Sequence, residues 1–170
     1  MTPIDLVDDL VKFITNVVRE YDLATKVEGI SKTPSVYAGY LPPEDDDREE
    51  EQGEEQKENL TPNDYPFVIV YFLTETTPAE KDGGDVTNIR LLVGTYSEDD
   101  QNGWRDPLNI ATRIKIELKK RKIIGPYSLT DNIQIELFEE QLRPFWHAII
   151  DLSFYIPQVQ PEIDWGEGIG

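Results

Sequence analysis

The chain has 170 residues, 38% of them hydrophobic, and a formal net charge of −18, with 34 acidic side chains against 16 basic ones. That length suffices for one domain with a packed core and is short for two. The acidic balance argues against binding to the outside of nucleic acid, because phosphate neutralisation needs an excess of Lys and Arg. It predicts a solvated acidic surface or, alternatively, attraction to a basic partner.

The absence of cysteine excludes disulfides and thiolate zinc sites. No apolar run approaches the roughly 20 residues of a membrane span, and the N-terminus lacks a signal-peptide pattern. We therefore expect a cytoplasmic protein without a membrane partner.

A helix is predicted at the N-terminus, where Thr2 is a typical cap, Pro3 suits the first position and Asp5 is an acid in the first turn. Such a helix would have a wide apolar face, which we expect to pack on a sheet. The residues that recur at helical spacing on this face are Ile4, Val7, Leu10, Val11, Ile14, Val17, Val18 and Tyr21.

A short strand is predicted at 35–41, followed by an acidic insertion at 42–64. Between residues 44 and 58 there are ten carboxylates and two basic side chains, a net charge of −8. This self-repelling segment cannot bury enough apolar surface to offset its ordering entropy. We expect it to be a flexible loop within a single domain covering 1–157, which is followed by an extended arm at 158–170.

Two β segments follow the insertion. The run at 65–73 is apolar almost throughout, as in a central strand or one that is covered on both faces. From Ile89 onward, apolar residues alternate with others, which indicates a strand. We expect residues 67–74 and 86–95 to form an antiparallel hairpin.

A polar turn at 97–103 leads into a second helix, for which Asp106 is the predicted cap and Pro107 the first residue. The basic residues of its last turn complement the helix dipole. Its predicted apolar residues are Leu108, Ile110, Ala111, Ile114 and Leu118.

A further strand pair is predicted at 133–138 and 146–156. The order of elements predicts an α+β fold, a mostly antiparallel sheet with two main helices on one face. Leu92, Ile149 and Tyr155 then fall on the other face, and a partly apolar uncovered face suggests contact with another subunit.

The sequence offers little for catalysis. His147 falls at an outward strand position and, without an identifiable nucleophile, is better explained as a partly exposed or interface histidine than as a catalytic base. Glu139 and Glu140 are expected to be solvated rather than an acid/base pair, since adjacent strand residues point to opposite faces. The carboxylates at 45–47 and 98–100 could bind a divalent ion but lack calcium-loop spacing. We predict no catalytic, cofactor or metal site.

Two groups of residues are candidates for subunit contacts. Trp104 and Arg105 are either an exposed interface anchor or, for the tryptophan, a lid folded over the core. The basic residues of the second helix are either a solvated face or a docking patch for an acidic neighbour. The predicted interface residues are Tyr96, Trp104, Arg105, Lys119, Lys120, Arg121, His147, Ile149 and Tyr155.

The series VGTYSEDDQNGWRDPLNIATRIKIEL, followed by a hairpin that ends in EEQLRPFWHAIIDLSFYIP, resembles the tail terminator (tail completion) proteins of tailed bacteriophages and phage-tail-like particles. The resemblance covers about 65–157. The resemblance implies a six-fold ring on the head-proximal end of the tail tube that stops tube polymerisation and presents the joining surface for the head. The implied location is the head-proximal end of the virion tail, which is assembled in the cytoplasm of a bacterial host.

The partners implied are further copies of the chain, the tail tube protein, a neck or head-completion protein and, where the tail is contractile, a sheath protein. Two alternatives stay open. One is a neck or head-completion connector of the same particle. The other is a small host enzyme or binding module, which a pocket with converging polar groups around His147 or Glu139 would favour.

Overall fold

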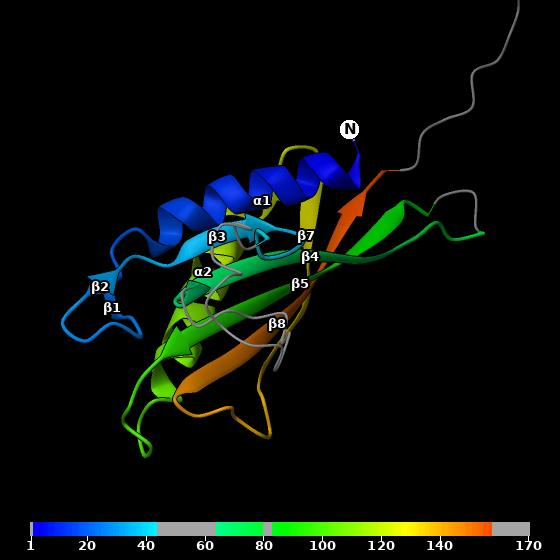
Figure 1. Ribbon diagram of the computed structural model, residues 1–170. Coiled ribbons are helices and arrows are strands. Elements are labelled where there is room, and N and C mark those ends of the chain that lie inside the picture. Colours follow the sequence, from blue (N-terminus) through cyan, green and yellow to red (C-terminus); the bar gives the residue numbers. More distant parts are fainter. Residues whose placement is uncertain (1, 44–63, 80–82, 158–170) are drawn as a thin grey trace, which may run out of the picture.

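The computed structural model describes residues 2–43, 64–79 and 83–157. Most of the acidic insertion and the whole of the predicted arm at 158–170 lie outside these residues. The larger elements are the helices α1 (Pro3–Val18) and α2 (Arg105–Arg121) and the strands β4 (Phe67–Thr76), β5 (Asp85–Tyr96), β7 (Tyr127–Leu137) and β8 (Phe145–Ile156) (Figure 1). The shorter strands are β1 (Leu23–Ala24), β2 (Ser31–Lys32), β3 (Ser35–Ala38) and β6 (Ile123–Ile124).

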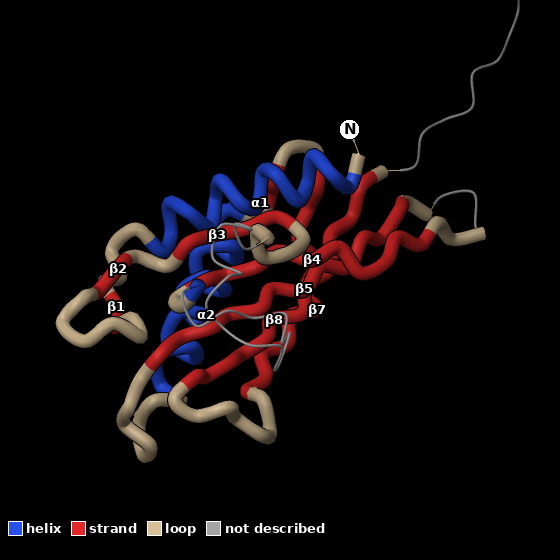
Figure 2. The backbone as a smooth tube through the Cα atoms, viewed as in Figure 1, coloured by secondary structure: helices blue, strands red, loops and turns tan. Residues whose placement is uncertain are grey.

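One six-stranded sheet, in the order β3-β4-β5-β8-β7-β6, forms the centre of the fold, and β1 and β2 form a separate small hairpin (Figure 2). All pairs in the six-stranded sheet are antiparallel except β3 and β4, which run parallel. The predicted hairpin is confirmed, with Val70 opposite Leu91. The α+β class with a mostly antiparallel sheet is also confirmed.

The N-terminus of α1 has the predicted cap. The Thr2 hydroxyl accepts from the Asp5 amide at 3.4 Å, while the Asp5 carboxylate accepts from the Thr2 amide at 2.7 Å. The Thr2 amide and hydroxyl both donate to the Asp5 carboxylate, and these two hydrogen bonds lower the pKa of Asp5 because they favour its charged form. The buried face differs from the predicted one in its first turn, since Leu6 is 1% exposed and Ile4 is 71% exposed.

Both helices pack on one sheet face and enclose the main core with the inward residues of β4, β5 and β8. Its side chains from α2 are Ile110, Ala111, Ile114 and Leu118, as predicted, while Leu108 is only half-buried. On β8 the inward residues include Ile150, Leu152 and Phe154, as the alternation predicts.

The predicted cap of α2 is wrong. The helix begins at Arg105, and Trp104 at the cap position makes no side-chain hydrogen bond to the helix. Asp106 lies within the first turn, where burial and then the nearby charge of Asp99 raise its pKa. The turn before the helix is instead ordered by Asp99, whose carboxylate accepts from the amides of Gln101 and Asn102 at 3.0 Å.

Candidate assembly surface

The sheet face opposite the helices, here called the outer face, carries a shallow apolar groove. It is about 340 Å³ in volume, crosses β4, β5 and β8, and ends at Phe138, the residue after β7. Leu92 and Ile149 are opposite each other in the β5–β8 pairing and form its floor. The other residues that line it are Tyr71, Leu73, Arg90 and Phe138.

A polar hollow of about 330 Å³ lies beside this groove and shares Leu73 with it. Asn88 donates to the Thr74 hydroxyl at 2.8 Å and accepts from the Ser153 hydroxyl at 2.7 Å, so these three side chains form a chain across β4, β5 and β8. Register shifts in β4 and β7 interrupt the strand pairing on either side. These polar groups are largely satisfied by one another.

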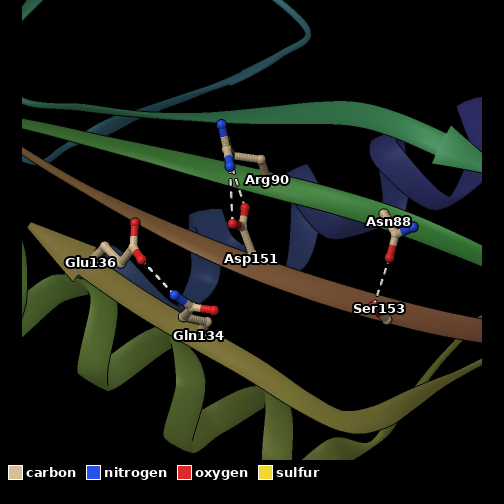
Figure 3. Close-up of polar contacts among 6 residues, drawn as sticks. All are labelled: Asn88, Arg90, Gln134, Glu136, Asp151 and Ser153. Atoms are coloured by element: carbon tan, nitrogen blue, oxygen red, sulfur yellow. Dashed lines mark hydrogen bonds and ion pairs between the residues drawn. The ribbon is translucent and has the colours of Figure 1, made fainter. Parts of the chain in front are cut away.

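Arg90 and Asp151 form a two-point ion pair between the groove and the hollow, with nitrogen–oxygen distances of 2.8 and 3.0 Å (Figure 3). Next to it on β7, Gln134 donates to Glu136. The carboxylate hydrogen bond raises the pKa of Arg90. The pair was not predicted, although a charged residue inside each of two apolar strands is a signal that could have found it.

A second, smaller core occupies the end of the outer face beyond the groove. Tyr65, Phe67, Ile69 and Tyr96 are buried there. Gly94 makes room for it, because a Cβ on this residue would come within 2.5 Å of the Phe67 ring. The outer face is therefore buried at this end, whereas the groove and the hollow are open.

His147 belongs to this buried end, and the prediction of a partly exposed histidine is wrong. Its side chain is fully buried, with Nε2 2.5 Å from the Tyr65 hydroxyl and the ring stacked on Phe138 at 5.0 Å. Nδ1 has no hydrogen-bond partner among the described residues. Burial lowers the pKa of His147 to about 4, because the charged ring would lose its hydration.

Trp104 ends the loop between β5 and α2 and Arg105 is the first residue of α2. The tryptophan is not a lid over the core. The residue is 37% exposed, its indole N–H donates to the Gln101 carbonyl at 3.0 Å, and Arg105 Cζ lies 5.4 Å from the ring centre. The tryptophan that closes this end of the core is Trp146, which is 3% exposed and has Gly103 against its ring. Trp104 thus keeps the exposure that an interface anchor needs.

The loop between β7 and β8 lies against the β5–α2 loop (Figure 1). The Ser97 amide donates to the Pro144 carbonyl at 2.9 Å, and the Trp146 indole donates to the Ser97 carbonyl at 3.0 Å. Arg143 in this second loop places Cζ 5.6 Å from the Trp146 ring centre. Arg143 was not predicted as an interface residue.

The basic end of α2 is exposed but partly engaged within the chain. Lys120 pairs with Glu117 at 3.1 Å, and Arg121 donates to the Ile123 carbonyl while its Cζ lies 5.5 Å from the Phe13 ring centre. The 17-residue helix, about 25 Å long, separates this end from Trp104 and Arg105.

The predicted interface residues therefore lie in several separate parts of the structure and do not form one surface. Tyr96 is nearly buried beside Phe145, at the end of the sheet that carries Trp104 and Arg105. Ile149 lies in the groove, and Tyr155 is 37% exposed at the far end of β8.

The groove and the hollow do not match an active site centred on His147 or Glu139, the residues considered from the sequence. Neither is lined by His147 or Glu139. Within the described ranges, no three His, Asp or Glu side chains are grouped closely enough to hold a metal ion. Nor is any helix there long and apolar enough to cross a membrane.

No model of a known protein family matches the chain. A comparison with curated proteins finds no match either.

Proposed function

We propose that this chain is a tail terminator of a tailed phage or phage-tail-like particle. Copies of it form a ring that caps the head-proximal end of the tail tube and joins the tube to the head or neck. The resemblance of residues 65–157 to tail terminator proteins supports this proposal. That region supplies β4, β5, α2, β6, β7 and β8.

The observation that carries the proposal is the open groove on the outer face. Leu73 and Phe138 at its edges are 43% and 38% exposed, and Leu92 and Ile149 form its floor. A contiguous apolar surface of this kind is typical of a contact with another protein. The neighbouring ion pair and amide groups are suited to the polar rim of such a contact.

The capping mechanism follows from ring geometry. A head-to-tail contact between identical copies uses two different surfaces and closes when the rotation per copy divides a full turn. One face of the closed ring copies the contact that a tube subunit makes, and the other lacks the geometry to accept another tube ring. The groove and the loop carrying Trp104 are the surfaces that we assign to contacts within the ring or with the tube.

The test is tail length, measured by electron microscopy in lysates in which this protein alone has been removed. We expect overlong tails without heads, because nothing then ends tube polymerisation. Supplying the intact chain from a second gene copy should restore tail length, and a chain with Ile149→Lys should restore it much less.

Other outcomes are informative. Tails of normal length beside unjoined heads would assign the chain to the neck connector instead. Intact, infectious particles would exclude both assembly roles and leave the enzyme or binding-module alternative.

A further inference from the structure

Two adjoining loops at one end of the sheet, together with the first residue of α2, present a surface that we call the guanidinium patch, made of Trp104, Arg105, Leu142 and Arg143. Trp104 is 37% and Leu142 58% exposed, and both arginines are exposed. The hydrogen bonds of Ser97 to the other loop hold the two halves of the patch together. The patch therefore combines two cations with two exposed apolar side chains, and the hydrogen bonds between the loops fix their relative positions.

Both guanidinium groups can bind a carboxylate of another copy, although the charge of Arg105 already adds to the backbone hydrogen bonds that lower the pKa of the nearby Asp99. Each lies over a tryptophan ring, at 5.4 Å for Arg105 and 5.6 Å for Arg143. A guanidinium stacked in this way keeps its N–H groups, which lie in its own plane, available for carboxylate oxygens. Within the described part of the chain, neither arginine forms an ion pair.

The chain itself contains a segment of matching composition. Residues 162–167 read EIDWGE, so that the carboxylates of Glu162 and Asp164 alternate with Ile163 and Trp165. The acidic run at 44–58 has no aliphatic or aromatic residue and offers nothing to the apolar half of the patch. Two copies with a net charge of −18 each repel, so a contact between them gains most by placing carboxylates on such cations.

The distances exclude a contact of Glu162 and Asp164 with the patch of their own copy. The patch lies beyond the first residue of β8, whereas residues 158–170 follow its last one. This strand has 12 residues, and its first and last Cα atoms are about 36 Å apart at a rise of 3.3 Å per residue. A fully extended chain from Pro157 reaches about 25 Å by Asp164, so Glu162 and Asp164 fall short of the patch on their own copy.

We propose that the guanidinium patch binds residues 162–167 of a second copy, with Glu162 and Asp164 paired to Arg105 and Arg143. The contact joins opposite ends of β8 in the two copies and is therefore head to tail. The inference deepens the proposed function and rests on it, because the proposed function requires a ring of copies and repetition of this contact closes that ring.

The test uses two full-length charge-reversal variants. The patch variant carries Arg105→Glu and Arg143→Glu, and the arm variant carries Glu162→Arg and Asp164→Arg. Sedimentation velocity should show self-association of the wild type and at least about tenfold weaker association of each variant, because like charges then meet at the contact. An equimolar mixture should regain association, since each contact again joins opposite charges.

A matched control carries Lys12→Glu and Lys26→Glu, exposed cations far from the patch in sequence, and has the same charge change as the patch variant. It should associate like the wild type, and circular dichroism should show all variants folded. Variants that associate like the wild type, a mixture no better than its components, or a wild type that stays monomeric would each overturn the contact.

The same variants separate this inference from the proposed function. If both variants restore tail length like the wild type, the contact is wrong and the capping role stands. If the association pattern holds but the wild type has no effect on tail length, the contact stands and the capping role is wrong.

Discussion

The hydroxyl of Tyr65 lies 2.5 Å from Nε2 of His147, although 82 residues separate them along the chain. Tyr65 lies two residues before Phe67, the first residue of β4, and its ring centre is 4.6 Å from that of Phe145. The contact ties the chain on either side of α2 into one buried aromatic cluster on the outer face.

The free energy of unfolding should decrease as the pH is lowered, because His147 is buried in its neutral form. Burial lowers its folded-state pKa from 6.5 to about 4, whereas in the unfolded chain the side chain keeps its ordinary value. Between pH 6.5 and 4 the unfolded state therefore binds a proton that the folded state does not. The contribution of neutral His147 to the free energy of unfolding is fully present above pH 6.5. It is lost as the pH falls toward 4, a change of about 3 kcal/mol.

Urea unfolding at pH 7 and pH 4.5 measures this loss, and His147→Phe is the reference because it titrates no imidazole while the carboxylates stay the same. The wild type should lose more stability than the variant over this interval. Equal losses in the two proteins would show that His147 is accessible to water in the folded state.

Gly94→Ala should destabilise the fold. Its Cβ would lie 2.5 Å from the Phe67 ring and 2.8 Å from the Tyr65 ring, where both neighbours are buried. Overpacking of this kind costs about 1–3 kcal/mol in the free energy of unfolding. The clash should be relieved in part by Phe67→Leu, so that the two changes together cost less than the sum of each alone in urea unfolding.

The two tryptophans near the guanidinium patch should behave differently. Trp146→Ala removes a side chain that is 3% exposed and should cost about 3–5 kcal/mol of unfolding free energy. Trp104→Ala removes one that is 37% exposed and should cost about 1 kcal/mol, while impairing self-association. Thermal unfolding and sedimentation measure the two effects, and unchanged association of Trp104→Ala would remove it from the interface.

Ile149→Lys should separate folding from assembly. Ile149 lies in the apolar groove, so a buried ammonium would oppose any partner there, whereas the unassembled chain can leave the charge in water. The matched control is Ile116→Lys on α2, where the isoleucine is 42% exposed. Light scattering should show association at least about tenfold weaker for Ile149→Lys and unchanged for Ile116→Lys. Similar association of the two variants would argue against the groove as a contact between copies of the chain.

The sequence by itself determined the elements whose signals are local. The cap at Thr2 depends on a residue three positions away, and the stripe of Ile110, Ile114 and Leu118 depends on neighbours one turn apart. Strand alternation likewise assigned Ile150 and Ile149 to opposite faces of β8. These patterns are set by backbone periodicity, which few long-range contacts can override.

Only the tertiary structure decided which positions are covered. His147 alternates as an outward residue, yet Tyr65 and Phe138, from distant segments, bury it. Asp106 and Pro107 have the pattern of a helix start, but the helix begins at Arg105 after a turn ordered by Asp99. The parallel pairing of β3 with β4 and the contact between the β5–α2 and β7–β8 loops also join residues far apart in sequence. Periodicity assigns a residue to a face, but burial depends on what the rest of the chain packs onto that face.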